Sequence, residues 1–144
     1  MLTELVVKDC IFCAMVRKEI PYVEVFSNEH LFAFMDIGPL NKGHVLIVPK
    51  KHYPTMFEVP SEIGTELLKT MQILGKAIMQ ATNAGGLNVI QNNHPPAGQA
   101  VFHVHWHLVP RFEGDGILKW TPSKYDSSAE QKALGKLICE NINT

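Results

Sequence analysis

Apolar side chains recur every three or four positions in the middle of the chain, and this spacing predicts one long helix. It places the apolar residues along a single face, where they can be buried together. The stripe consists of Ile63, Leu67, Met71, Leu74 and Ile78. Ser61 is expected to cap the start of this helix, and Asn83 is expected to end it together with the two following glycines, Gly85 and Gly86.

Short apolar runs on both sides of this helix predict the strands of a sheet. Three runs precede it, at residues 23–27, 31–37 and 44–48, and two follow it, at residues 87–91 and 100–110. The order indicates an α+β fold, with a mainly antiparallel sheet of about five strands in a single domain over residues 1–144.

Two further helices are expected near the ends of the chain. A short one is predicted over residues 10–19, because Pro21 stops it. The last begins at about Ser128, and its apolar side consists of Leu134, Leu137, Ile138 and Ile142.

The composition is that of an ordinary globular protein and argues against several function classes. The 144 residues carry 19% charged side chains and a net charge of -1, without the excess of Lys and Arg that marks nucleic-acid binders. No apolar run approaches the roughly 20 residues of a membrane span, and the N-terminus is a poor signal peptide. Only three cysteines are present, which favours a reducing compartment and a cytoplasmic location.

The most informative segment holds three histidines in alternation, at residues 103, 105 and 107. In a strand, alternate side chains point to opposite faces, so the three rings share one face. The other face is expected to be core and consists of Phe102, Val104, Trp106 and Leu108. Alternate Cα atoms lie about 6.5 Å apart, so all three rings cannot bind one metal ion unless the strand bends. The row suits phosphate chemistry, in which one ring meets phosphorus and its neighbours orient it.

The string HVHWHLV resembles the signature of the histidine triad family, in which three histidines alternate with hydrophobic residues. Four segments resemble this family in the expected order: CIFC, AFMDIGPLNKGHVLIVPKKH, LNVIQNN and GQAVFHVHWHLVPR. The resemblance therefore covers most of the chain. It implies a nucleotide hydrolase or transferase that cleaves a dinucleoside polyphosphate or a nucleoside phosphoramidate.

The resemblance also implies a role for each matching polar residue. His105 corresponds to the nucleophile that forms a nucleotidyl-histidine intermediate. His107 and His44 correspond to residues that contact phosphate oxygens, and His103 is the first residue of the triad. Two residues of the loop before the triad are expected at the phosphate site, Asn92 and Gln99.

Further positions match the nucleoside pocket of the family, which binds purine nucleotides and prefers adenosine. Asp36 corresponds to an acidic residue that accepts hydrogen bonds from the ribose. The base pocket is expected to be lined by Ile11, Phe12, Phe34 and Ile37, although core packing explains Phe12 equally well. The resemblance further implies a homodimer, formed by the long helix and the edge of strand 87–91. Trp120 and the last helix fall where family members differ.

Cys10 and Cys13 have the spacing of zinc ligands, and a tetrahedral structural site needs two more. The resemblance supplies His52 and His103, because some bacterial members of the family hold zinc with such a Cys-Cys-His-His set. A Cys-x-x-Cys pair also fits two buried thiols without metal. Cys139 in the last helix is expected to be packed.

One position departs from the family pattern. Ala100 stands where the phosphoramidase branch commonly has a hydroxyl residue that can donate to the leaving group. The sequence therefore favours a leaving group that needs less protonation, such as a phosphate.

Two other functions remain open at this point. In a zinc-dependent metallohydrolase, His103 and His105 would hold a catalytic ion. In a non-catalytic nucleotide-binding interaction module, the pocket would bind without turnover. The presence of the complete set of matching histidines favours the enzyme.

Overall fold

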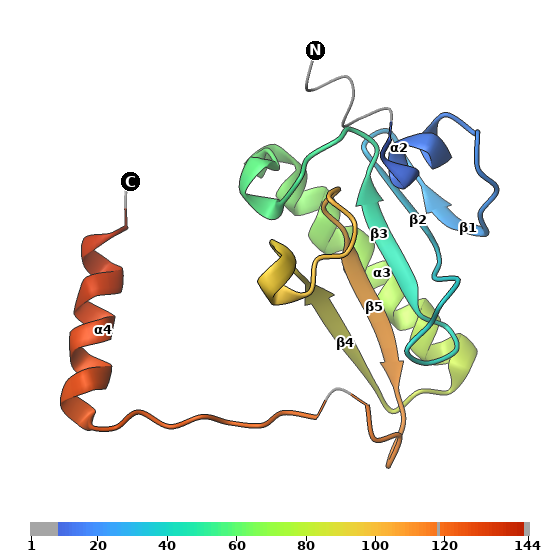
Figure 1. The fold of residues 1–144 in the computed structure, drawn as a ribbon. Helices are drawn as coiled ribbons and strands as arrows, with labels where there is room; N and C mark the ends of the chain where they lie inside the picture. Colours follow the sequence, from blue (N-terminus) through green and yellow to red (C-terminus); the bar gives the residue numbers. More distant parts are fainter. Residues whose placement is uncertain (1–8, 118, 143–144) are drawn as a thin grey trace.

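A computed structural model describes residues 9–117 and 119–142, with a long helix packed against one face of a five-stranded sheet (Figure 1). The helices are α2 (Ile11–Val16), α3 (Gly64–Thr82) and α4 (Ser128–Glu140), and the 3-10 helices are η1 (Met56–Glu58), η2 (Ser61–Ile63) and η3 (Pro95–Ala97). The strands are β1 (Glu24–Ser27), β2 (Leu31–Met35), β3 (Val45–Pro49), β4 (Gly86–Gln91) and β5 (Trp106–Arg111). Each predicted helix and strand has a counterpart among them.

The strands follow the order β1-β2-β3-β5-β4, and each neighbouring pair is antiparallel. This confirms the predicted α+β class. Strand β5 enters between β3 and β4, so the last strand of the sequence lies inside the sheet and β4 forms an edge. The histidine segment thereby comes to lie beside β3.

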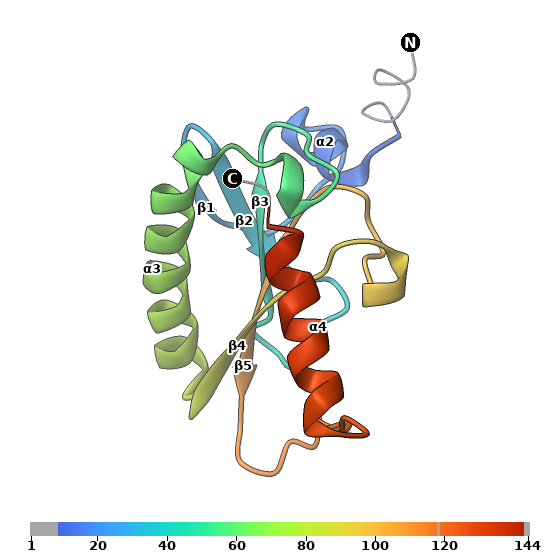
Figure 2. The same ribbon diagram turned by 90° about the vertical axis from the view of Figure 1, so that its left-hand side faces the viewer.

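The two faces of the sheet carry different cores because side chains alternate along its strands. Leu74 and Ile78 of α3 are buried on one face, in a cluster with Ile47. Phe12 of α2 is buried on the other face, in a cluster with Val48. The apolar stripe of the long helix is therefore covered by the core of its own chain (Figure 2).

The predicted cap of the long helix is wrong, whereas the predicted end is confirmed. Ser61 lies inside the 3-10 helix η2, and α3 begins at Gly64 with no side-chain cap. Pro60 holds an extended backbone, so the tight turn at residues 61–63 takes the place of the first turn of α3. At the other end, Asn83 adopts the left-handed conformation, with φ 57° and ψ 33°.

The predicted strand 100–110 is too long, since β5 begins only at Trp106. The pairing of β3 with β5 ends at Trp106, so the residues before it have no strand beside them. The N–H of Val104 donates instead to the carbonyl of Tyr53. The chain therefore turns before β5, and Phe102, which was expected in the core, is 50% exposed.

The C-terminal helix is separate from the sheet, beyond the edge formed by β4 (Figures 1 and 2). Each residue from Lys119 to Ile142 is exposed in the single chain. The expectation that Cys139 is packed is therefore wrong for the single chain, because α4 has no side chains over it there. Over the described ranges, none of the helices has the length and apolar character needed to cross a membrane. The cytoplasmic location stays a prediction.

Candidate active site and metal centre

Two of the predicted phosphate-binding histidines meet because β3 and β5 are neighbours in the sheet. His44 directly precedes β3, and His107 lies on β5 opposite Leu46. The Nε2 atom of His44 is 2.9 Å from Nδ1 of His107. The ring of His105 lies 4.9 Å from that of His107, between centroids. The structure thus brings these three histidines together.

Hydrogen bonds assign the neutral tautomer of each of these rings, through backbone groups for His44 and His105 and through His44 for His107. The N–H of Leu40 donates to Nδ1 of His44 over 3.1 Å, so the proton of His44 is on Nε2 and is donated to His107. His107 therefore carries its own proton on Nε2. Nδ1 of His105 lies 2.7 Å from the carbonyl of His103 and must donate to it. The Nε2 lone pair of His105 is therefore free for a reaction.

The surroundings of these rings favour their neutral forms. Burial, together with the neighbouring His105 and His44, lowers the pKa of His107 to about 4. Burial also lowers the pKa of His44 and His105 from the ordinary value of 6.5, although Asp36 acts in the opposite direction on both. At neutral pH the cluster therefore contains uncharged imidazoles, and an uncharged ring is the form that can act as a nucleophile.

These pKa shifts predict that the protein loses stability in mild acid. The unfolded chain binds a proton at His107 below about pH 6.5, whereas the folded chain does so only near pH 4, so lower pH favours unfolding. The shift corresponds to at most about 3 kcal/mol for this residue. Urea unfolding between pH 7.5 and pH 4.5 measures the free energy of unfolding of the wild type and of His107→Gln. The free energy of unfolding should fall less steeply in the variant, and equal slopes would contradict the assignment.

Asp36, the predicted ribose ligand, lies at the edge of the same cluster. It follows β2, and its Oδ2 atom is 3.6 Å from Nε2 of His44. Its Oδ1 atom accepts a hydrogen bond from the N–H of Gly38, which holds the carboxylate in place. The carboxylate is partly exposed, so it can also accept hydrogen bonds from a ligand hydroxyl.

The four residues predicted to line the base pocket fall into two groups. Phe12 and Phe34 are buried and pack edge to face on each other, and the Phe12 ring also contacts His105, with 5.2 Å between centroids. Ile11 is 44% exposed, and Ile37 is fully exposed in the single chain. The two phenylalanines thus belong to the core behind the histidines, and the role of all four in base binding stays a prediction.

The loop before the triad is held by Gln99, one of the predicted phosphate ligands. Its side chain accepts from the N–H of His94 and donates to the carbonyls of Pro54 and Val101. These hydrogen bonds use both the oxygen and the nitrogen of the Gln99 amide, so in this structure the side chain positions the loop. The other predicted ligand, Asn92, follows β4 directly and is half-buried.

Cys10, Cys13, His52 and His103 form a second cluster, as predicted, and their four candidate ligand atoms all lie within 4.8 Å of one another. The Sγ–Nδ1 distances are 3.3 Å from Cys10 to His103 and 3.4 Å from Cys13 to His52. The two Nδ1 atoms are 3.2 Å apart. A zinc tetrahedron with ordinary bond lengths has edges of about 3.3–3.8 Å. The donor set and its geometry therefore fit zinc.

Local structure and charge also suit a cation at this cluster. Cys10 caps the start of α2 and Cys13 lies one turn further, so the Cys-x-x-Cys spacing directs both sulfurs to one side. Burial and the neighbouring Cys10 raise the pKa of the Cys13 thiol to about 12, so a thiolate there needs a positive partner. The Nε2–H of His103 donates to the carbonyl of Pro49, which leaves Nδ1 free for a metal.

The ring of His103 lies at the cysteine cluster, where the resemblance placed it. It still shares a face of the sheet with the other two rings, since Phe12 contacts both His103 and His105, and His107 lies opposite Leu46 of the same core cluster. His105 belongs to neither of the metal-binding groupings found among the described residues, which disfavours a catalytic zinc between His103 and His105. Sequence reasoning missed the backbone groups of Leu40 and Pro49, because main-chain partners leave no residue-type signal.

The model of the HIT domain matches residues 17–114, which is more than half of the chain. Adenosine 5'-monophosphoramidase hnt1 of Schizosaccharomyces pombe is 39% identical, over 92% of this chain and 98% of its own length. Adenylylsulfatase HINT3 of Arabidopsis thaliana is 37% identical, over 85% of this chain and 65% of its own.

Solved structures show the same fold. A member of the HIT family from Bacillus subtilis matches with a TM-score of 0.85 and 29% identity, over 94% of this chain and 99% of its own. A zinc-bound histidine triad family protein from Mycobacterium smegmatis matches with a TM-score of 0.73 and 30% identity, over the same shares of the two chains. With the family model and these relatives in agreement, the chain belongs to the HIT family.

Proposed function

We propose that the protein is a hydrolase of adenosine-containing nucleotides that cleaves the bond between the α-phosphorus and its leaving group through a covalent intermediate on His105. The observation that carries the proposal is the Nε2 lone pair of His105, which is free because Nδ1 donates to the carbonyl of His103. Two other neutral histidines lie beside it, and Phe12 contacts its ring.

In the proposed first step, Nε2 of His105 attacks the α-phosphorus and the bond to the leaving group breaks. The leaving group departs with the bonding electron pair. The imidazole ring becomes positively charged, and the hydrogen bond from Nδ1–H to the carbonyl of His103 stabilises this charge. The Nε2–H of His107 is available for a phosphate oxygen, and His44 maintains that tautomer.

In the second step, water attacks the phosphorus and the bond to Nε2 of His105 breaks. The products are the free nucleoside monophosphate and the neutral histidine, and the proton from water passes to solvent. Dividing the displacement into two steps lowers each barrier, because imidazole is both a good nucleophile and a good leaving group.

The relatives support an adenosine-containing substrate but differ in what they release. One is named as an adenosine 5'-monophosphoramidase and another as an adenylylsulfatase, so the adenosine moiety is common to both names while the leaving group is not. Residues near the leaving group are therefore expected to decide the substrate. Ala100 is the position at which this chain departs from the phosphoramidase pattern, and it is exposed.

Ala100→Ser tests this assignment. A hydroxyl at this position can donate to a departing amine, and one hydrogen bond contributes about 1 kcal/mol, so kcat/KM for an adenosine phosphoramidate should rise about fivefold. Hydrolysis of an adenosine phosphosulfate should change little, because sulfate leaves without protonation. Ala97→Ser, on the exposed 3-10 helix η3, serves as the matched control. No gain with the phosphoramidate would contradict the role of Ala100.

We further infer that the four-residue cluster holds a structural zinc ion, whose coordination by Cys10, Cys13, His52 and His103 would fasten α2 to the sheet. The geometry of the cluster supports this, as does the zinc-bound relative. We also infer a homodimer, in which the free edge of β4 pairs with the same edge of a second copy. An edge strand with unpaired backbone groups supports this, since such edges are rarely left open.

The deciding experiment measures release of adenosine monophosphate from three substrates: an adenosine phosphoramidate, an adenosine phosphosulfate and a diadenosine polyphosphate. Quenching in base during turnover, followed by mass spectrometry at alkaline pH, should detect an adenylyl group on the peptide that contains His105, because the phosphorus–imidazole bond is hydrolysed in acid. Tight binding of nucleotide without release from any of the three would support the non-catalytic binding module instead.

A further inference from the structure

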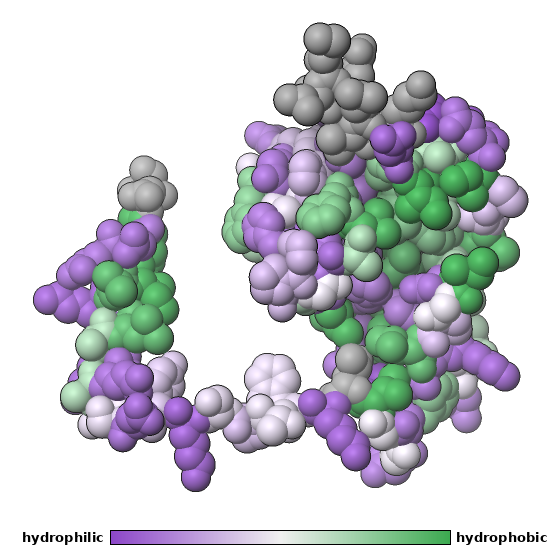
Figure 3. All heavy atoms as spheres, viewed as in Figure 1, coloured by the Kyte–Doolittle hydropathy of each residue, from purple (hydrophilic) through white to green (hydrophobic). Residues whose placement is uncertain are grey.

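The turn of residues 112–117 follows β5 and contains a carboxylate that the proposed reaction does not use. Beyond this turn, residues 119–127 form a hydrophilic segment that runs to α4 through open space (Figure 3). Each of these residues is exposed, so the segment does not cover the turn in the single chain. The carboxylate belongs to Asp115, and its hydrogen-bond partners all lie within residues 41–117.

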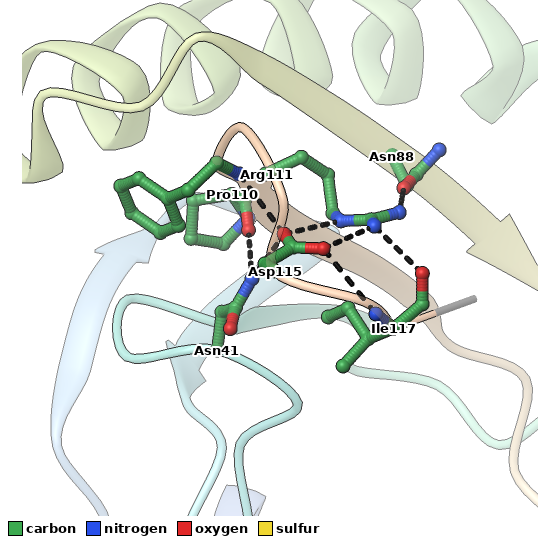
Figure 4. Close-up of polar contacts among 7 residues, drawn as sticks. Asn41, Asn88, Pro110, Arg111, Asp115 and Ile117 are labelled. Atoms are coloured by element: carbon green, nitrogen blue, oxygen red, sulfur yellow. Dashed lines mark hydrogen bonds and ion pairs between the residues drawn. The ribbon is translucent and has the colours of Figure 1, made fainter. Parts of the chain in front are cut away.

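Asp115 accepts hydrogen bonds from three parts of the chain (Figure 4). Nε and Nη2 of Arg111, the last residue of β5, donate to its two oxygens, and the N–H groups of Phe112 and Ile117 donate from the turn itself. Nδ2 of Asn41 donates from the loop before β3 over 2.9 Å. The ion pair with Arg111, supported by these N–H groups, holds the pKa of the Asp115 carboxyl well below its usual range. Asp115 is therefore an ionised acceptor at every pH at which the histidine rings are neutral.

Arg111 is fixed as firmly as its partner. It also donates to Oδ1 of Asn88 on β4 and to the carbonyl of Ile117, each over 2.7 Å. The side chains of Arg111 and Asp115 are 23% and 10% exposed, so this bidentate ion pair is largely shielded from water. The carboxylate thus has a fixed position at the ends of β4 and β5, where it can hold a neighbouring loop.

The loop that contacts this carboxylate joins β2 to β3 and ends at His44. Its residues 37–40 are exposed, so apolar packing does little to define its position. Asn41 is half-buried, and its Nδ2 donates both to Asp115 and to the carbonyl of Pro110, each over 2.9 Å. This one side chain therefore fastens the loop to the end of β5.

The same loop holds His44 through two backbone groups. The carbonyl of Asn41 accepts from the N–H of His44 over 3.1 Å, and the N–H of Leu40 donates to Nδ1 of its ring over 3.1 Å. The second bond places the ring proton of His44 on Nε2, from which it is donated to His107. A displacement of the loop by about 1 Å would take the Leu40 N–H out of hydrogen-bond range. The tautomers of both rings therefore depend on the position of the loop.

We propose that Asp115 is a positioning residue for the histidine cluster. With Arg111 it holds Asn41 in place, and the loop of Asn41 in turn sets the tautomers of His44 and His107. The catalytic consequence rests on the proposed hydrolysis, in which Nε2–H of His107 is directed to a phosphate oxygen. The carboxylate acts through the loop and takes no part in the chemical steps. Without it, the proton of His107 can move to Nδ1, and the phosphate loses a donor in part of the molecules.

NMR of the imidazole nitrogens tests the positioning without any substrate, since the chemical shift of each ring nitrogen depends on whether it carries a proton. Asn41→Ala removes both bonds to the end of β5 and leaves the ion pair intact. In the wild type, His44 and His107 should carry the proton on Nε2. In the variant both should show mixed tautomers, while His105, which a different backbone group holds, stays unchanged. Wild-type tautomers at His44 and His107 in the variant would overturn the proposal.

Asn88→Ala is the matched control, because it makes the same chemical change at another partner of Arg111 that does not belong to the loop. It should preserve both tautomers. Asp115→Asn keeps the shape of the side chain but removes its charge, and it should disturb the tautomers as Asn41→Ala does. If Asp115→Asn fails to fold, Asn41→Ala still tests the link. Equal disturbance by Asn41→Ala and Asn88→Ala would mean that the network only stabilises the fold, and would overturn the proposal.

Turnover then connects the positioning with the proposed hydrolysis. In Asn41→Ala, kcat for release of adenosine monophosphate from an adenosine phosphoramidate should fall about 10-fold to 100-fold with little change in KM, because a misplaced donor is lost mainly to the transition state. Mixed tautomers with an unchanged kcat would overturn the catalytic consequence. A wild type that releases no monophosphate from any substrate would overturn the hydrolysis, and the NMR result alone would then decide the positioning.

Discussion

His105→Asn is expected to lower the turnover number about 10⁴-fold or more while the zinc content and the fold remain those of the wild type. Asparagine keeps a polar side chain of similar size but has no nucleophilic nitrogen lone pair, so the first chemical step is lost. The ring contributes no ligand atom to the cysteine cluster. Initial rates of adenosine monophosphate release and metal analysis of the same sample check both parts of the prediction.

A matched control separates this effect from a general sensitivity to changes at histidine. His30 is exposed between β1 and β2 and bonds to Glu66 of α3, away from the catalytic cluster. His30→Asn should therefore retain wild-type turnover. If His105→Asn instead lost zinc together with activity, the catalytic metal of the alternative mechanism would be favoured over the covalent one.

Cys13→Ser is expected to remove the zinc ion and to lower the melting temperature by roughly 10–20 °C. The cysteine is buried, and without a metal the two thiols and two imidazoles would be left packed together without a central charge. Turnover should fall as well. The ring of His103 belongs to this cluster, and its backbone carbonyl accepts the hydrogen bond that positions the His105 ring. Calorimetry and metal analysis of protein purified without added zinc measure the effect.

Cys139→Ser is the matched control, since it makes the same chemical change at an exposed thiol. It should leave both the zinc content and the melting temperature close to wild type. Substoichiometric zinc in the wild type, together with an unchanged melting temperature in Cys13→Ser, would mean that the cluster is held by hydrogen bonds between thiols and imidazoles alone.

The sequence alone determined the elements whose signal is local and periodic. The stripe from Leu67 to Ile78 defines a helix face because its period is a property of the helix itself. Apolar runs such as 44–48 define buried strands for a similar reason. The Cys-x-x-Cys spacing also acts locally, since it places two sulfurs within the first turn of α2. The triad pattern, through its resemblance to a known family, was sufficient to select the histidines that the structure brings together.

Only the tertiary structure decided where each ring points. Alternation predicted a shared face for His103 and His105, and both rings contact Phe12. It did not predict that His103 would meet Cys10 of α2 or that the N–H of Val104 would donate to Tyr53, because the segment before β5 has no neighbouring strand. The proton positions on the histidines depend on carbonyl and N–H groups from distant segments. A periodic pattern reflects the local conformation of one segment, whereas these features arise from contacts between segments far apart in the chain.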